Sequence, residues 1–288
     1  MHRQILSLLF LFCLLFAGCT SSTDTIEDRR NLGEKMGLLG ALVGVISVAA
    51  SYYHLHKKVS KLNHALAKEK EKSEQLLLNI LPESIAQELK EKGKANAQHH
   101  DEVTVLFTDF KDFTKISELL SPSELVRELD ECFTQFDSIT EKYHIEKIKV
   151  IGDSYMAAGG LKDDEQAVDN VVLAALEMQK YIERRKSEKE KLNQPYFLMR
   201  AGIHTGAVSA GVTGSKKFQY DIWGDTVNVA SRMESSGEAG KVNISGATYQ
   251  MIKDNSTFSF IRRGEVEAKN KGMIEMYFVE KKVERRLL

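Results

Sequence analysis

The 288-residue sequence lacks an excess of charge of either sign and has few cysteines, and both absences exclude classes of function. The formal net charge is −1, so there is no basic field of the kind that binds nucleic acid. Cys13, Cys19 and Cys132 are too few for a disulfide framework and do not have the spacing of metal ligands. Cys132 lies in an apolar-periodic stretch, which predicts a buried thiol in the core. The rest of the composition is typical of a globular protein with one ordinary domain plus attachments.

Charged side chains are also missing from much of the N-terminal region. Residues 1–22 carry an apolar run behind His2 and Arg3, which is typical of a signal peptide or a first membrane helix. The stretch Leu15–Cys19 is similar to a bacterial lipobox, in which the cysteine is acylated after cleavage. A lipid anchor at Cys19 and an uncleaved membrane helix are both open interpretations.

A second apolar segment, residues 36–56, contains no Asp, Glu, Lys or Arg. Its length suits one membrane-spanning helix. Tyr52 and Tyr53 lie at its end as interfacial aromatics, and Lys57 and Lys58 follow directly. Lysines on this flank place the C-terminal side in the cytoplasm. We therefore expect a protein anchored in the inner (cytoplasmic) membrane, with the larger part of the chain cytoplasmic.

Residues 57–92 lack glycine and contain a single proline, Pro82. Several apolar residues recur there at alternating steps of three and four, which is the heptad spacing of a two-stranded coiled coil. A single solvated helix with charge pairs four residues apart is the alternative. Pro82 breaks the pattern, and a new helical turn is predicted after it.

The remaining sequence, residues 101–282, mixes strand and helix patterns without a regular alternation, which indicates an α+β fold. Residues 183–191 are interpreted as a solvated helix end and loop. Strands are expected at 102–108, 145–151, 154–160, 196–204, 207–213, 217–222, 241–245 and near 257–264 and 274–280, and helices across 113–142 and at 165–186, 225–235 and 246–253.

Two aspartates each close a short apolar strand. Asp109 follows residues 103–107, and Asp153 follows residues 148–152. A carboxylate held at the end of a strand can position Mg²⁺ against a nucleoside triphosphate. Taken singly, each motif also suits a helix cap or a hairpin turn.

Three stretches, FTDFKDFT, KVIGDSYMA and FQYDIWGDTVNVASRMES, together resemble the catalytic domain of class III nucleotidyl cyclases. The resemblance implies a ferredoxin-like βαββαβ core with an extra C-terminal β-hairpin. Residues just ahead of it, LLLNILPESIAQELKEKG, resemble the coupling segment that precedes many membrane-tethered cyclase domains. The implied reaction is conversion of ATP to 3′,5′-cyclic AMP and pyrophosphate with two ions of Mg²⁺ or Mn²⁺.

The resemblance also implies a role for each of eight residues. Asp109, Asp153 and the backbone carbonyl of Phe110 correspond to the metal ligands. Lys149 and Asp221 correspond to the base-selecting pair: an ammonium donates to adenine N1, and a carboxylate accepts from the N6 amino group. Guanylate cyclases of the family usually carry Glu and Cys there. The other implied contacts are Asn228 to the ribose, Arg232 to the α-phosphate and Lys269 to the triphosphate.

In this family the metal aspartates come from one subunit, and the base-selecting pair, Asn and Arg come from the other. The chain carries both sets, so a homodimer with two composite sites is expected. The alternatives are a guanylate cyclase and a catalytically silent, membrane-anchored protein that only dimerises or binds nucleotide. Loss of a metal aspartate or of Arg232 would mark the silent class, and none is lost.

Overall fold

A computed structural model of the chain describes residues 26–162, 164–214, 216–268 and 272–282. The proposed leader at 1–22, with Cys13 and Cys19, and the phosphate-binding candidate Lys269 lie outside the described residues. Contacts divide the chain into two units, residues 1–76 and 77–288.

In the described part of the first unit, the chain forms one uninterrupted helix, α2 (Ile26–Leu78), of 53 residues, which ends two residues into the second unit. It contains the predicted spanning segment, 36–56, and most of the heptad segment. By length and composition α2 is capable of crossing a membrane, with a mean hydropathy of 1.7 in its most apolar window. The apolar side chains at the heptad positions Leu62, Leu66 and Leu76 are exposed in the single chain.

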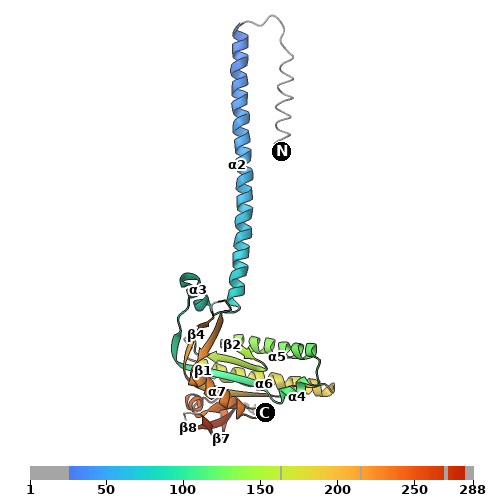
Figure 1. The fold of residues 1–288 in the computed structure, drawn as a ribbon, viewed down its shortest axis with the longest axis vertical. Helices are drawn as coiled ribbons and strands as arrows, with labels where there is room; N and C mark the ends of the chain where they lie inside the picture. Colours follow the sequence, from blue (N-terminus) through green and yellow to red (C-terminus); the bar gives the residue numbers. More distant parts are fainter. Residues whose placement is uncertain (1–25, 163, 215, 269–271, 283–288) are drawn as a thin grey trace, which may run out of the picture. The chain divides into compact units, whose positions relative to one another are not determined.

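The second unit is built on one eight-stranded sheet with the order β2-β3-β1-β4-β6-β8-β7, in which β5 also pairs with β4 (Figure 1). All neighbours are antiparallel except β4 and β6, which are parallel. The strands are β1 (Gln98–Phe110), β2 (Glu146–Ile151), β3 (Ser154–Gly159), β4 (Met199–Thr213), β5 (Gln219–Trp223), β6 (Val242–Ser245), β7 (Phe258–Ala268) and β8 (Gly272–Lys281). The helices are α3 (Glu83–Lys92), α4 (Phe113–Ser117), α5 (Pro122–Lys142), α6 (Ala167–Lys191), α7 (Asp225–Ser235) and α8 (Gly246–Ile252).

This topology confirms the expected fold. The elements β1, α5, β2, β3, α6 and β4 follow one another as βαββαβ, and their strands lie in the order β2-β3-β1-β4 of a ferredoxin-like core. The β7–β8 hairpin is the extra C-terminal piece, and β6 joins it to the core.

Two expectations for individual elements are wrong. Residues 196–204 and 207–213 do not form separate strands, because β4 runs without a break from Met199 to Thr213 and pairs with β1 and then with β5. Residues 183–191 do form a helix end, as expected, but without the expected loop, because α6 continues to Lys191. The buried carboxylate of Glu128 on α5 accepts a hydrogen bond from Arg185 at 2.6 Å and another from Lys189. These contacts hold the last turns of α6 against α5.

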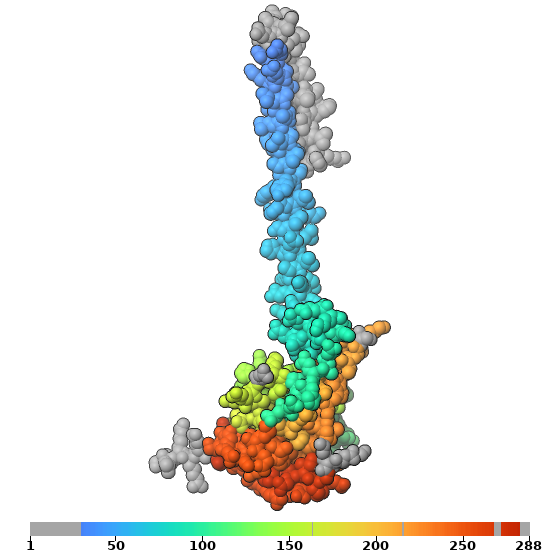
Figure 2. Space-filling model, turned by 90° about the vertical axis from the view of Figure 1, so that its left-hand side faces the viewer, coloured from blue at the N-terminus to red at the C-terminus, as the bar shows by residue number. Residues whose placement is uncertain are grey.

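Helices cover the two faces of the sheet differently. On β1, Leu106 and Phe110 pack under α5 and α6, whereas Val105 and Phe107 point to the opposite face. We call these the α5/α6 face and the α3/α7 face. The α3/α7 face is covered by α7 and by the coupling segment, residues 77–97, which includes α3 and buries Leu81, Ile85 and Ala86. In Figure 2 this segment, in teal, lies on the surface of the second unit.

Candidate active site

The two predicted metal aspartates lie together at one end of the α3/α7 face. Asp109 is the penultimate residue of β1, and Asp153 lies in the tight turn between β2 and β3, where Gly152 takes the required left-handed conformation (φ 64°). Ser154 Oγ donates to Asp109 Oδ2 at 2.7 Å. The pKa of Asp153 is raised by burial and then by the negative charge of Asp109, while the backbone of Phe110 acts in the opposite direction by hydrogen bonding.

This donor set fits a divalent cation. Two carboxylates and the Phe110 carbonyl supply only oxygen, and mutual repulsion between partly buried carboxylates is relieved by a cation. Across the described parts of the chain, no cluster of three or more His, Cys, Asp or Glu side chains could hold a metal ion. Such a small protein set suits Mg²⁺, which usually keeps waters and takes phosphate oxygens as its other ligands.

Arg200 is part of this site, and sequence reasoning did not find it. Its Nη2 donates to Asp109 Oδ1 at 3.0 Å, and its Nε lies 3.0 Å from Glu234 Oε1. In the sequence Arg200 stands 91 positions after Asp109, in an ordinary strand. The signal that would have revealed it is the β1–β4 register, in which Asp109 and Arg200 are direct partners.

The predicted base-selecting residues also meet. Lys149 Nζ donates to Asp221 Oδ2 at 2.6 Å, although the two residues are 72 positions apart. The side chain of Asp221 is 9% exposed and that of Lys149 is 25% exposed. The second oxygen of Asp221 accepts from the Ile222 N–H at 2.9 Å, so the carboxylate is fixed in orientation.

Asn228 and Arg232 are exposed, one turn apart on α7. Arg232 makes no ion pair within the described residues of this chain. Glu234, two positions after Arg232, points toward Arg200 and the aspartates. Residues two apart on a helix point about 200° apart, so Arg232 faces away from the aspartates of its own chain.

Comparison with known proteins identifies the family. The family model described as "Adenylate and Guanylate cyclase catalytic domain" matches residues 95–281. The chain belongs to this family. It is 41% identical over 234 residues to rat "Guanylate cyclase soluble subunit beta-2", covering 78% of this chain and 33% of that protein. It is 38% identical over 239 residues to an "Adenylate cyclase" of Mycobacterium tuberculosis, covering 81% of this chain and 52% of that protein.

The chain thus spans between a third and about half of the length of these curated relatives. Among solved structures, the adenylyl cyclase CyaB from P. aeruginosa matches with a TM-score of 0.61 and 28% identity, over 66% of this chain and 98% of that one. The catalytic core of a rhodopsin-guanylyl cyclase with converted specificity, in complex with ATPαS, matches with a TM-score of 0.59 and 33% identity, over 65% of this chain and 100% of that one. The family therefore includes enzymes named for either purine nucleotide.

A β-bulge in the cyclase domain turns Lys149 toward the α3/α7 face. Lys147 pairs with Ala157 and Lys149 pairs with Met156, so Ile148 is an extra residue without a partner on β3. Lys147 accordingly lies on the α5/α6 face, where it contacts Asp137 at 2.8 Å. In a regular strand Lys149 would share that face.

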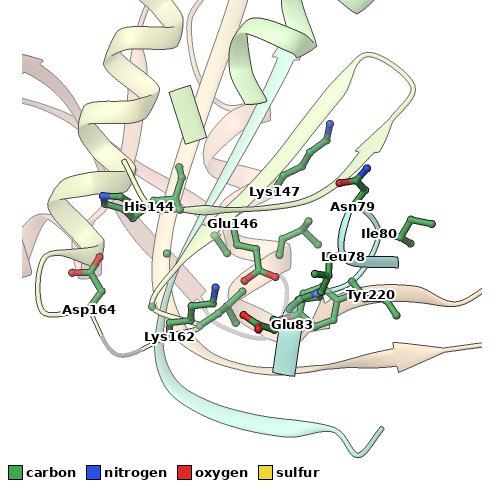
Figure 3. Close-up of a pocket in the computed structure, with 18 residues that line it drawn as sticks. Leu78, Asn79, Ile80, Glu83, His144, Glu146, Lys147, Lys162, Asp164 and Tyr220 are labelled. Atoms are coloured by element: carbon green, nitrogen blue, oxygen red, sulfur yellow. The ribbon is translucent and has the colours of Figure 1, made fainter. Parts of the chain in front are cut away.

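A cavity of about 600 Å³ lies between the coupling segment and the strands of the cyclase domain (Figure 3). Figure 3 shows the carboxylate of Glu146 pointing toward the amino group of Lys162, with Glu83 and Tyr220 nearby. Its lining contains none of the predicted site residues.

Proposed function

We propose that the chain is an adenylate cyclase that converts ATP to 3′,5′-cyclic AMP and pyrophosphate in a homodimer. The observation that carries this proposal is the contact between Lys149 and Asp221 at 2.6 Å on the face of the sheet that bears Asp109. A donor (Lys149) and an acceptor (Asp221) side by side match the acceptor N1 and the donor N6 amino group on the edge of adenine.

Base choice follows from hydrogen-bond chemistry. The Lys149 ammonium can donate to adenine N1, and the Asp221 carboxylate can accept from the N6 amino group. Guanine presents O6 as an acceptor and N1–H as a donor, so its N1–H would face the ammonium and its O6 the carboxylate. Because Asp221 is nearly buried, the wrong base leaves its oxygen without a partner, and such a mismatch discriminates strongly.

In the reaction the ribose 3′ hydroxyl gives up its proton to solvent, its oxygen forms a bond to the α-phosphorus, the bond from that phosphorus to the bridging oxygen breaks, and pyrophosphate leaves with the electron pair. Asp109, Asp153 and the Phe110 carbonyl would hold Mg²⁺ or Mn²⁺, two ions per site. Bound divalent ions lower the pKa of the hydroxyl and neutralise the triphosphate. Arg232 stabilises charge on the α-phosphate, Asn228 orients the ribose, and Lys269 contacts the triphosphate.

The opposite directions of Glu234 and Arg232 on α7 support the dimer. The buried side of the helix faces the metal aspartates of the same chain, so the exposed Asn228 and Arg232 are available to a second chain. A homodimer would supply both sets twice. Association through the exposed heptad positions of α2 would raise the local concentration of the two catalytic domains.

Localisation belongs to the same proposal. Residues 36–56 within α2 would span the inner membrane, with the catalytic domain in the cytoplasm, and Cys19 is a candidate lipid anchor. In this arrangement residues 57–92 form the connecting helix, and residues 101–282 form the catalytic domain.

The test is product formation by the full chain, purified in detergent, with ATP or GTP and Mg²⁺ or Mn²⁺. Cyclic AMP from ATP in excess over cyclic GMP from GTP, lost in Asp153→Asn, is the expected result. Excess cyclic GMP would replace the proposal with a guanylate cyclase. No product from a folded, dimeric, nucleotide-binding protein would support the catalytically silent alternative.

A further inference from the structure

Three charged side chains are linked in a row that begins at the candidate metal site and ends at a buried carboxylate. Arg200 lies between Asp109 and Glu234, with one contact of 3.0 Å on each side. Their side chains are 26%, 22% and 9% exposed for Arg200, Asp109 and Glu234 respectively. The guanidinium is therefore shared between a carboxylate that would ligate a cation and one that would not.

The backbone fixes the position of Glu234. Gly202 on β4 lets α7 approach so closely that a Cβ atom there would lie 1.9 Å from the backbone nitrogen of Glu234. The buried Asn243 amide donates to the Met233 carbonyl at 2.8 Å, one residue earlier. The packing of the main chain of α7 against β4 therefore fixes the backbone of Glu234 beside Arg200.

Protein donors occupy both oxygens of Asp109. Oδ1 accepts from Arg200, and Oδ2 accepts from Ser154 Oγ. A cation that binds this carboxylate must compete with the guanidinium, because two positive charges cannot share one oxygen without repulsion. Arg200 then needs another anion, and Glu234 is already in contact with it.

The Arg200–Glu234 contact is poised for this change. Arg200 Nε and Glu234 Oε1 are both fully buried and only 3.0 Å apart, yet neither makes an aligned hydrogen bond within the described residues. Turning the guanidinium away from Asp109 and toward Glu234 would align the pair. Buried polar atoms gain most from such an alignment.

We propose that Glu234 is a positioning residue that holds Arg200 when a divalent cation replaces it at Asp109, and so sets the affinity of the site for that cation. This inference rests on the proposed metal site and adds a residue that governs it. It predicts that Glu234 affects metal binding without touching metal or nucleotide.

The test measures Mn²⁺ binding to the full chain in detergent, in the absence of nucleotide, from the electron paramagnetic resonance signal of free Mn²⁺. Glu234→Gln should raise the Mn²⁺ dissociation constant about tenfold, because the cation then meets one negative charge fewer and a guanidinium paired only with Asp109. The double variant Arg200→Met/Glu234→Gln removes the competitor as well, and should bind Mn²⁺ at least as tightly as the unaltered chain.

Glu128→Gln is the matched control, since it also removes a buried carboxylate paired with an arginine, but between α5 and α6. It should leave Mn²⁺ binding unchanged. Equal affinity in Glu234→Gln and the unaltered chain, or equal weakening in the single and double variants, would overturn the proposal. If Asp109→Asn binds Mn²⁺ as well as the unaltered chain, the metal assignment in the proposed function fails, and this inference fails with it.

Discussion

The two faces of the cyclase sheet use charged residues in different ways. On the α5/α6 face the buried ion pairs join helices to one another, as Glu128 does with Arg185 and Lys189. On the α3/α7 face the charged residues cluster at the sheet itself: Asp109 with Arg200, and Lys149 with Asp221. The first arrangement stabilises the fold, and the second leaves polar groups available to substrate, metal or a second chain.

The difference teaches that burial alone does not mark a functional residue. Glu128 and Asp221 are almost equally buried, at 10% and 9% side-chain exposure. Glu128 pairs with two cations from one neighbouring helix, Arg185 on one oxygen and Lys189 on the other. Asp221 pairs with a single cation, Lys149, and its second oxygen accepts from the Ile222 N–H. The number of cations on the carboxylate, and not its burial, distinguishes the two.

The largest effect expected on the α3/α7 face is loss of activity in Asp153→Asn and Arg232→Ala, each by about a thousandfold or more. If the sites are composite, mixing the two inactive variants restores activity, because one site of every mixed dimer is intact. Random exchange should give about a quarter of the unaltered rate. The assay is cyclic nucleotide formation after co-expression. No recovery in proven mixed dimers would contradict the composite site.

Exchange of Lys149 and Asp221, the proposed base-selecting pair, should have the next largest effect. Lys149→Glu with Asp221→Cys inverts the donor and acceptor pattern, so the ratio of kcat/KM for ATP to that for GTP should fall by about a hundredfold or more. The values of kcat/KM for ATP and for GTP are measured on the same preparation. Lys147→Glu is the control, since it alters the neighbouring lysine on the α5/α6 face and should leave the ratio unchanged.

Gly202→Ala tests whether the α3/α7 face depends on close approach of α7. The new methyl group would meet the backbone of Glu234 at 1.9 Å, so α7 must move outward. Overpacking of this kind costs about 1–3 kcal/mol of unfolding free energy, and here it should lower activity more than stability predicts. Thermal unfolding and kcat are the two measurements. Full activity with lowered stability would show that the position of α7 is not critical.

Glu128→Gln is the corresponding change on the α5/α6 face. It leaves Lys189 without its partner, while Arg185 keeps an ion pair with Glu131 at 2.7 Å. Removing one partner of a buried ion pair costs about 3–5 kcal/mol of unfolding free energy, and because Arg185 keeps Glu131 the loss should lie near the lower end, at about 3 kcal/mol. Denaturant unfolding should show this loss, whereas activity per folded molecule stays constant. A change in kcat would mean that the two faces are less independent than the structure indicates.

The smallest effect concerns Cys132, on the α5/α6 face. Burial raises the pKa of its thiol to about 12. The thiolate is the reactive form, and an ordinary exposed cysteine reacts faster as pH rises from 7 to 9, through its usual pKa. Cys132 should remain nearly unreactive over that range in the native chain. Mass spectrometry after alkylation measures it site by site, with the unfolded chain as the reactive control.

Much of the fold was predictable from local pattern. The helix at 225–235 and the Gly152–Asp153 turn were placed correctly, because each is determined by neighbouring residues. The full extent of α6 was not, because it depends on Glu128, far away in sequence. Arg200 was missed for the same reason: only strand pairing reveals its partner. The contact of Lys149 with Asp221 was anticipated through family resemblance and not through the pattern of either strand.

The extra residue at Ile148 makes the position of Lys149 sensitive to strand register. If β2 slipped by one residue so that Ile148 paired with Met156, Lys149 would pair with Tyr155 and turn to the α5/α6 face, away from Asp221. Loss of the Ile148 codon would instead make Lys147 and Lys149 consecutive, so Lys149 would stay opposite Met156 on the side of Asp221. A deletion at this one position is therefore expected to preserve the Lys149–Asp221 contact, whereas a slip of the full-length strand would abolish it.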